Sequence, residues 1–116
     1  MNNITVIKRD NREVSFDPNK VFNAIRNAVN QKEKYNKTKS IGIAYEVTEE
    51  VEKVIQDNVN KITVEEIQDI IEQELMEEGY YEIAKCFIKY RDKHKKIRNI
   101  DNKFSEAINM IDEYVG

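Results

Sequence analysis

Two adjacent cations, Lys8 and Arg9, end a short apolar run directly before Asp10–Asn11. Asp and Asn tolerate the left-handed backbone of a tight hairpin turn, so the two cations are predicted to end the first strand of a hairpin. Lys20 follows in the first turn of a predicted helix, where free backbone N–H groups and the helix dipole favour anions. Together these groups are suited to binding a polyphosphate.

Two interpretations of the hairpin remain open. Neighbouring residues of a strand point to opposite faces, so Lys8 and Arg9 reach one ligand only if the turn twists the strand. In that interpretation, four apolar residues form a wall on which a base lies: Val6, Val14, Val21 and Ile25. In the other interpretation the cations are only an exposed hairpin tip, and the residues alone favour this one.

The reactive side chains do not indicate catalysis. The chain has one histidine and one cysteine, and it lacks a Ser-His-Asp arrangement, a Walker loop and a GxGxxG segment. Cys86 lies in an apolar helical pattern, which favours a buried small hydrophobe over a reactive thiol. His94 lies among lysines and arginines, as surface histidines do, although it could hydrogen-bond a phosphate. We therefore expect no catalytic residue and no metal ligand.

The net charge of −3 hides a strong asymmetry. Between Glu46 and Glu82 there are thirteen acidic residues and two lysines, whereas Lys85 to Arg98 has seven basic residues and one aspartate. These stretches are either solvated helix faces of opposite sign, or the basic stretch supplies cations to an anion site. An alternative is a nucleic-acid-binding or protein-interaction module that uses the basic helix 85–98. The acidic surface and the lack of an aromatic stacking platform disfavour nucleic acid.

Apolar spacing predicts a mainly α fold of the α+β type, in which a small N-terminal sheet caps a four-helix bundle. Strands are predicted at Ile4–Lys8 and Glu13–Phe16, with a very short third strand at Asn60–Thr63. A polar loop is predicted at 31–39.

Four amphipathic helices are predicted, each with its own start or stop signal. They run from the Asp17 N-cap and Pro18 to about Asn30, from about Ser40 to Asn58, from the Thr63–Glu66 capping box to Gly79, and from about Tyr80 to Arg98. In the last helix, Ile83, Ala84, Phe87 and Ile88 are expected to face the core.

Residues 99–116 repeat apolar side chains at helical spacing from Phe104 to Val115, which predicts an amphipathic C-terminal helix. It is expected to pack on the bundle or to meet a partner. The ending at Gly116 indicates a piece of a longer protein. No apolar run is long enough to span a bilayer and no signal-peptide pattern is present, so we expect a cytoplasmic protein.

Three motifs in register resemble the ATP-cone family, the nucleotide-sensing domain of ribonucleotide reductases. The match covers Ile4 to Arg98 in the correct order and spacing. The hairpin motif is carried by Val6, Lys8-Arg9-Asp10, Phe16-Asp17 and Lys20-Val21. The second motif, a helix with an isoleucine–glutamine pair after a short strand, is carried by Val64–Asp69, and the third by Ala84 and Tyr90-Arg91.

This resemblance implies a nucleotide site rather than an exposed hairpin tip. It implies that Lys8 and Arg9 hold phosphates, while later helices approach the nucleotide. The site residues that it implies are Val6, Lys8, Arg9, Val14, Lys20, Val21, Val64, Gln68, Tyr90, Arg91 and His94. Asn11 stands where the family usually has glycine. Val14 stands where some relatives have a glutamate that reads the adenine amino group, which puts that contact in doubt.

The chain is most similar to the N-terminal regulatory domain of anaerobic (class III) ribonucleoside-triphosphate reductases. The resemblance implies that residues 1–98 bind ATP or dATP with Mg²⁺ and control the activity and oligomeric state of the parent enzyme. It implies that residues 99–116 lead to that enzyme's catalytic domain. The expected partners are adenine nucleotides, this catalytic domain and further copies of the full-length protein, with no membrane and no nucleic acid.

Overall fold

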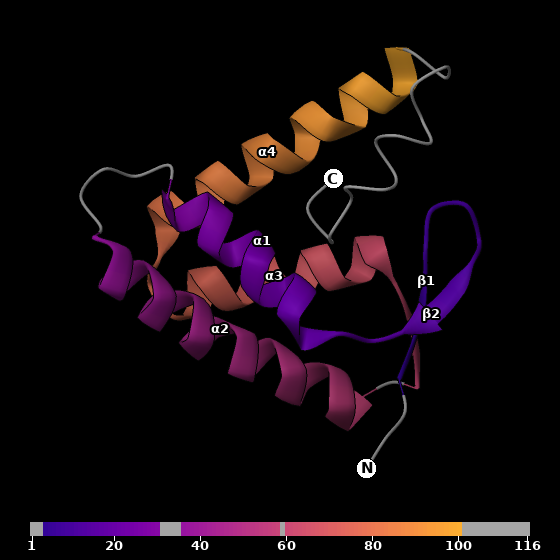
Figure 1. Ribbon diagram of the computed structural model, residues 1–116, viewed down its shortest axis with the longest axis horizontal. Coiled ribbons are helices and arrows are strands. Elements are labelled where there is room, and N and C mark those ends of the chain that lie inside the picture. The colour runs from indigo at the N-terminus through magenta and orange to yellow at the C-terminus, as the bar shows by residue number, and fades with distance from the viewer. Residues whose placement is uncertain (1–3, 31–35, 59, 101–116) are drawn as a thin grey trace.

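The computed structural model describes residues 4–30, 36–58 and 60–100, with the backbone alone for Asn58 and 96–100. In this part of the chain three short strands and four helices follow in the order β1–β2–α1–α2–β3–α3–α4 (Figure 1). The predicted mainly α fold with a small sheet is confirmed. The predicted C-terminal helix and its apolar stripe lie outside the described residues.

The sheet has the strand order β2-β1-β3. β1 (Thr5–Ile7) pairs antiparallel with β2 (Glu13–Ser15) and parallel with β3 (Lys61–Thr63). The hairpin turn is closed by the Asn11 N–H, which donates to the Lys8 carbonyl oxygen at 2.9 Å, and Asn11 has a φ of 70°. Asparagine tolerates this left-handed conformation, so the predicted turn is confirmed without glycine.

Two helices follow the hairpin. α1 (Pro18–Asn30) begins with proline at its first position, and the Asp17 carboxylate accepts a hydrogen bond from the Asn19 N–H at 3.0 Å. α2 (Lys37–Asn58) begins three residues earlier than predicted. The reason is that the Asn36 side chain accepts a hydrogen bond from the Lys39 N–H at 2.8 Å, so asparagine caps a lysine-rich turn that resembled a loop.

The last two helices have the predicted signals. α3 (Val64–Glu77) opens with the complete capping box between Thr63 and Glu66. Gly79 follows the end of α3 with a φ of 85°, which a residue with a side chain rarely adopts. α4 (Tyr81–Ile100) extends slightly beyond the predicted end.

The hydrophobic core lies where α1 and α3 each pack against both α2 and α4 (Figure 1). From α4, Ile83, Ala84 and Phe87 are fully buried as predicted, but Ile88 is 37% exposed and this prediction is wrong. Ile88 lies about 100° around the helix from Phe87, and α1 and α3 cover only one side of α4. Cys86 is half-buried at the edge of this core. No helix among the described residues has the length and apolar character needed to cross a membrane.

Candidate functional site

The hairpin places Arg9 on the first turns of α3. β1 and β3 are parallel neighbours and β3 runs directly into α3, so a side chain just beyond β1 lies beside the start of that helix. Arg9 Nε contacts Glu65 Oε1 at 3.1 Å, and its Nη2 donates to Gln68 Oε1 at 3.3 Å. Only 16% of the Arg9 side chain is exposed, so Arg9 is more than a solvated hairpin tip.

Gln68 is fully buried and has one side-chain group unpaired. Its Oε1 accepts from Arg9, but its Nε2 has no hydrogen-bond partner among the described residues. An unsatisfied buried amide donor is uncommon because it costs about 1–3 kcal/mol. A ligand that supplies an acceptor at this point would remove that cost.

Arg91 approaches the same turns of α3 from α4. It donates to Asp69 Oδ1 at 2.8 Å, to Glu65 Oε2 at 3.0 Å and to Glu72. Burial acts to lower the pKa of Arg91, but the hydrogen bonds that Arg91 donates to Asp69, Glu65 and Glu72 together outweigh it and raise the pKa above its usual value. The guanidinium is therefore a permanent positive charge, held in place by carboxylates.

Glu65 links the two arginines, because one of its oxygens contacts Arg9 and the other contacts Arg91. Two open recesses meet at this link and share Arg9 and Glu65. One, of about 210 Å³, is lined also by Glu72, Ile88, Arg91, Asp92 and Lys95. The other, of about 300 Å³, is lined also by Ile7, Lys8, Asn11, Thr63 and Val64. We call the two recesses together the hairpin–α4 site.

The structure brings together five residues of the predicted nucleotide site. Lys8, Arg9, Val64 and Arg91 line the hairpin–α4 site, and Gln68 hydrogen-bonds to it through Arg9. Lys8 and Arg9 line the same recess although they are adjacent in the chain. This is the arrangement expected if the turn twists the end of the strand. The arrangement can hold an extended anion between the hairpin and α4, because it places cations from two elements beside an unpaired amide donor.

The predicted apolar wall does not form at the surface. Three of its four members have no exposed surface: Val6, Val21 and Ile25. They belong to the hydrophobic core, where the sheet and α1 meet. Val14 is half-buried on β2, on the side of β1 opposite β3. These side chains support the site from beneath, and none of them lines either recess.

Three other predicted residues do not line the two recesses. Lys20 is half-buried in the first turn of α1 and lines neither recess. Tyr90 and His94, also half-buried, contact each other on α4 with ring centroids 4.3 Å apart and planes tilted by 43°, and neither ring lines the recesses.

The carboxylates that hold the two arginines were not predicted from the sequence. Glu65, Asp69 and Glu72 belong to an acidic stretch that was interpreted as a solvated helix face. The available signal was their spacing of three and four residues, which places them on one side of α3. Lys95 was also missed, although it lies one turn beyond Arg91.

The model of the ATP cone domain family matches residues 4–96, which is most of the chain and includes every residue of the hairpin–α4 site. The chain belongs to the ATP-cone family. As an ATP cone it is an adenine-nucleotide-binding regulatory domain, so the predicted family and nucleotide-binding role are confirmed.

Named relatives are reductases of two kinds. The chain is 31% identical over 100 residues to the ribonucleoside-diphosphate reductase subunit alpha of Chlamydia pneumoniae, covering 82% of this chain and 10% of the relative. It is 29% identical over 108 residues to the anaerobic ribonucleoside-triphosphate reductase of Haemophilus influenzae, covering 93% of this chain and 15% of the relative. The chain thus spans between a tenth and a sixth of these relatives, and their similar identities do not indicate which kind of parent it has.

Proposed function

We propose that the hairpin–α4 site binds the triphosphate of ATP or dATP, and that binding regulates an anaerobic ribonucleoside-triphosphate reductase of which this domain is a part. The observation that supports this site best is the convergence of Arg9 and Arg91 on α3 beside the unpaired amide of Gln68. Lys8 and Lys95 line the two recesses and add positive charge.

In the nucleotide-free structure, Arg9 and Arg91 form ion pairs with carboxylates. Glu65 contacts both guanidinium groups, and Asp69 and Glu72 contact Arg91. Arginine pairs with phosphate in the same forked geometry as with carboxylate, so a triphosphate can replace Glu65 as the partner of both. Mg²⁺, which binds phosphate oxygens and few protein carboxylates, would offset the repulsion between the triphosphate and the acidic face of α3.

This arrangement favours a nucleotide over duplex nucleic acid as the ligand of α4. Arg91, in the middle of the basic helix, faces three carboxylates of α3 rather than solvent. A phosphate backbone that reached Arg91 would be repelled by these carboxylates. A nucleotide, in contrast, fits between the hairpin and the helix.

Calorimetry of the chain with ATP and dATP, each with and without Mg²⁺, tests the proposed ligand. We expect both nucleotides to bind, with GTP and a short DNA duplex as comparison ligands that bind more weakly. Ligand binding to the folded state also raises its melting temperature as the ligand concentration rises. The absence of heat with ATP and dATP up to millimolar concentrations would rule out the proposal.

The nature of the parent enzyme is the second part of the proposal. It rests on the resemblance of the sequence from Phe104 to Gly116 to the link into the catalytic domain of the anaerobic enzymes, and on the coverage of 93% of this chain by one of them. Sequencing the complete gene tests it directly. A diphosphate reductase beyond residue 116 would overturn this part and leave nucleotide binding untouched. A cytoplasmic location is part of the same proposal.

A further inference from the structure

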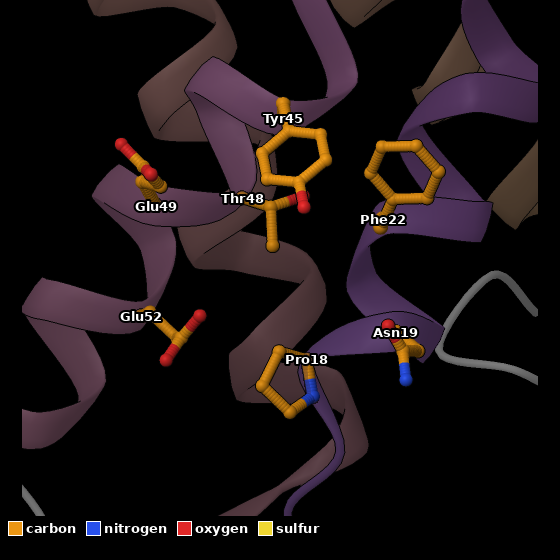
Figure 2. Close-up of a pocket in the computed structure, with 7 residues that line it drawn as sticks. All are labelled: Pro18, Asn19, Phe22, Tyr45, Thr48, Glu49 and Glu52. Atoms are coloured by element: carbon orange, nitrogen blue, oxygen red, sulfur yellow. The ribbon is translucent and has the colours of Figure 1, made fainter. Parts of the chain in front are cut away.

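A third recess, of about 250 Å³, lies between the start of α1 and the middle of α2 (Figure 2). None of its lining residues lines the hairpin–α4 site, so the two are separate. Pockets for drug-sized ligands usually measure about 300–1,000 Å³. This recess is therefore large enough for one side chain or a small molecule, and its volume is about half that of the two recesses of the hairpin–α4 site together.

Two aromatic rings form its apolar wall. Phe22 from α1 and Tyr45 from α2 meet edge to face, with centroids 5.5 Å apart and planes at 72°. Pro18 lies below them, on the same side as the open space (Figure 2). Arg26 of the same chain already lies over the Phe22 ring, with its guanidinium carbon 5.8 Å from the centroid. The two rings therefore offer surface mainly to an aliphatic stem, and the Tyr45 ring can also contact a cation.

Two carboxylates, Glu49 and Glu52, give the recess its charge. They lie one turn apart on α2; the Glu52 carboxylate points towards Pro18, whereas the Glu49 carboxylate points away from the two rings (Figure 2). The Gln56 amide reaches Glu52 at 3.4 Å, and Lys53 on the same helix pairs with Glu50 instead, at 3.5 Å. Neither Glu49 nor Glu52 has a cationic partner among the described residues, so a positively charged ligand would be attracted here.

The partial positive charge at the start of α1 does not oppose such a ligand strongly. The Asp17 carboxylate accepts the Asn19 N–H at 3.0 Å, and this negative charge offsets the helix dipole at the recess.

A buried, unsatisfied hydroxyl belongs to the wall of the recess. Thr48 is only 7% exposed, and its Oγ1 has no hydrogen-bond partner among the described residues. Its side chain points from α2 into the space bounded by Tyr45, Phe22 and Pro18 (Figure 2). Threonine in a helix has two common χ1 rotamers, so the hydroxyl can turn to accept an N–H from a ligand.

We propose that this recess binds the guanidinium group of an arginine from another polypeptide segment. An aromatic wall for the aliphatic stem, the Glu52 carboxylate for the planar fork, the added negative charge of Glu49 and a hydroxyl acceptor match arginine better than lysine. A polypeptide is favoured over a free cation because Ile41 and Tyr45, one turn apart on α2, are 41% and 62% exposed beside the recess. A segment that carries the arginine would cover this apolar surface.

Nuclear magnetic resonance titration of the chain with a leucine–arginine–leucine peptide, blocked at both ends, tests the proposal without any nucleotide. We expect the amide resonances of Tyr45, Thr48 and Glu52 to shift. The same peptide with citrulline, which has the shape of arginine without its charge, is expected to bind at least about fivefold more weakly. Equal binding of the two peptides would overturn the proposal.

Matched variants on α2 locate the contact. Glu49→Gln and Glu52→Gln are each expected to weaken the arginine peptide, whereas Asp57→Asn removes the same charge from an exposed position outside the recess and should change little. Thr48→Val is expected to weaken binding while leaving the melting temperature unchanged or higher, because it removes an unsatisfied hydroxyl. Equal losses in Glu49→Gln and Asp57→Asn would show only general attraction to an acidic surface and would overturn the proposal. Tighter binding of agmatine than of the peptide would overturn the assignment to a polypeptide.

Discussion

Arg9 and Arg12 lie on the same hairpin but differ in what they contact. Arg9 reaches Glu65 and Gln68 across the structure, whereas Arg12 pairs at 2.6 Å with Asp10 in its own turn and is exposed. A sequence pattern of clustered cations does not separate the two. The structure does, because only Arg9 lies on the side of the hairpin that faces α3.

Replacing Arg9 with alanine should therefore weaken ATP binding, whereas Arg12→Ala should change it little. Loss of one charge-assisted contact costs about 1.5–3 kcal/mol, which corresponds to roughly ten- to a hundredfold in affinity. Lys8→Ala should act in the same direction as Arg9→Ala. Calorimetry measures all three variants. Equal effects of Arg9→Ala and Arg12→Ala would place the phosphates elsewhere.

Substitution of Gln68 with methionine tests its unpaired amide. The nucleotide-free domain should lose no stability, because a buried unsatisfied donor is removed and Arg9 keeps Glu65. Nucleotide affinity should nevertheless fall. Gln73→Met is the control, since that amide pairs with Glu77 on the exposed side of α3. A variant that melts at a lower temperature and binds ATP normally would show that the amide only supports the fold.

α3 connects the other elements of the site, because Glu65 on its first turn holds Arg9 of the hairpin and Arg91 of α4 together. A phosphate that binds both arginines must displace the Glu65 carboxylate from them. The start of α3 thus couples the hairpin to α4, the helix that leads towards the C-terminus (Figure 1).

Glu65→Gln should raise the affinity for ATP in the presence of Mg²⁺, because the competing charge is lost. Glu77→Gln makes the same change in charge near the other end of α3 and measures the general effect of a less acidic surface. We expect the affinity for ATP to rise more in Glu65→Gln than in Glu77→Gln. An affinity reduced by Glu65→Gln would mean that this carboxylate helps to hold the ligand or its metal.

α2 and α3 also bring carboxylates together at their interface. Oxygens of Glu50, Glu74 and Glu78 lie within 4.8 Å of one another. Burial raises the pKa of Glu74, and the negative charges of Glu77 and Glu50 raise it further. A hydrogen bond with Glu46 is the main cause that raises the pKa of Glu78. In each carboxyl the folded state binds the proton more tightly than the unfolded chain does.

Stability contributed by this interface should therefore increase as the pH falls from neutral through the raised pKa values towards 4.5, the ordinary value for glutamate. Glu74→Gln should stabilise the domain at neutral pH and flatten this part of the profile. Urea unfolding over a pH series measures the difference between variant and parent. Asp10 is the same in both proteins, so its contribution to the pH dependence cancels in this difference. Its pKa is lowered, mainly by a hydrogen bond from the Arg12 N–H, so that contribution has the opposite sign. A constant difference across the series would contradict the prediction.

The whole domain has the organisation of a sensor. The proposed ligand site lies between a small sheet and α4, and the described residues there form no group of side chains suited to catalysis. A regulatory domain acts by binding two states of a larger assembly with different affinity. The consequence of nucleotide binding is therefore expected in the parent protein and not in the bound nucleotide.

The full-length parent should change its oligomer distribution differently with saturating ATP and with saturating dATP, while the isolated domain hydrolyses ATP no faster than background. Because the two nucleotides differ only by a ribose hydroxyl, the difference must come from small changes around the site. Analytical sedimentation of the full-length protein measures this. Identical profiles with the two nucleotides would contradict a role in controlling assembly.

Local signals in the sequence determined most of the elements. Asp10–Asn11 made the turn, Thr63 and Glu66 made the capping box, and Gly79 ended α3 as predicted. Each of these depends on residues a few positions apart, so its energetics can be judged from sequence. The start of α2 was predicted too late in the chain, because the capping residue Asn36 lies within a stretch of polar residues that is typical of a loop.

Tertiary structure alone decided which residues form the site. The contact of Arg9 with Gln68 spans 59 positions and exists because β1 and β3 pair in parallel, a pairing that each strand's own sequence does not specify. The same packing moved Val6 and Val21 from a predicted ligand wall into the core. Periodicity identifies which side of an element is apolar, but whether another element or a ligand covers that side depends on how the elements pack.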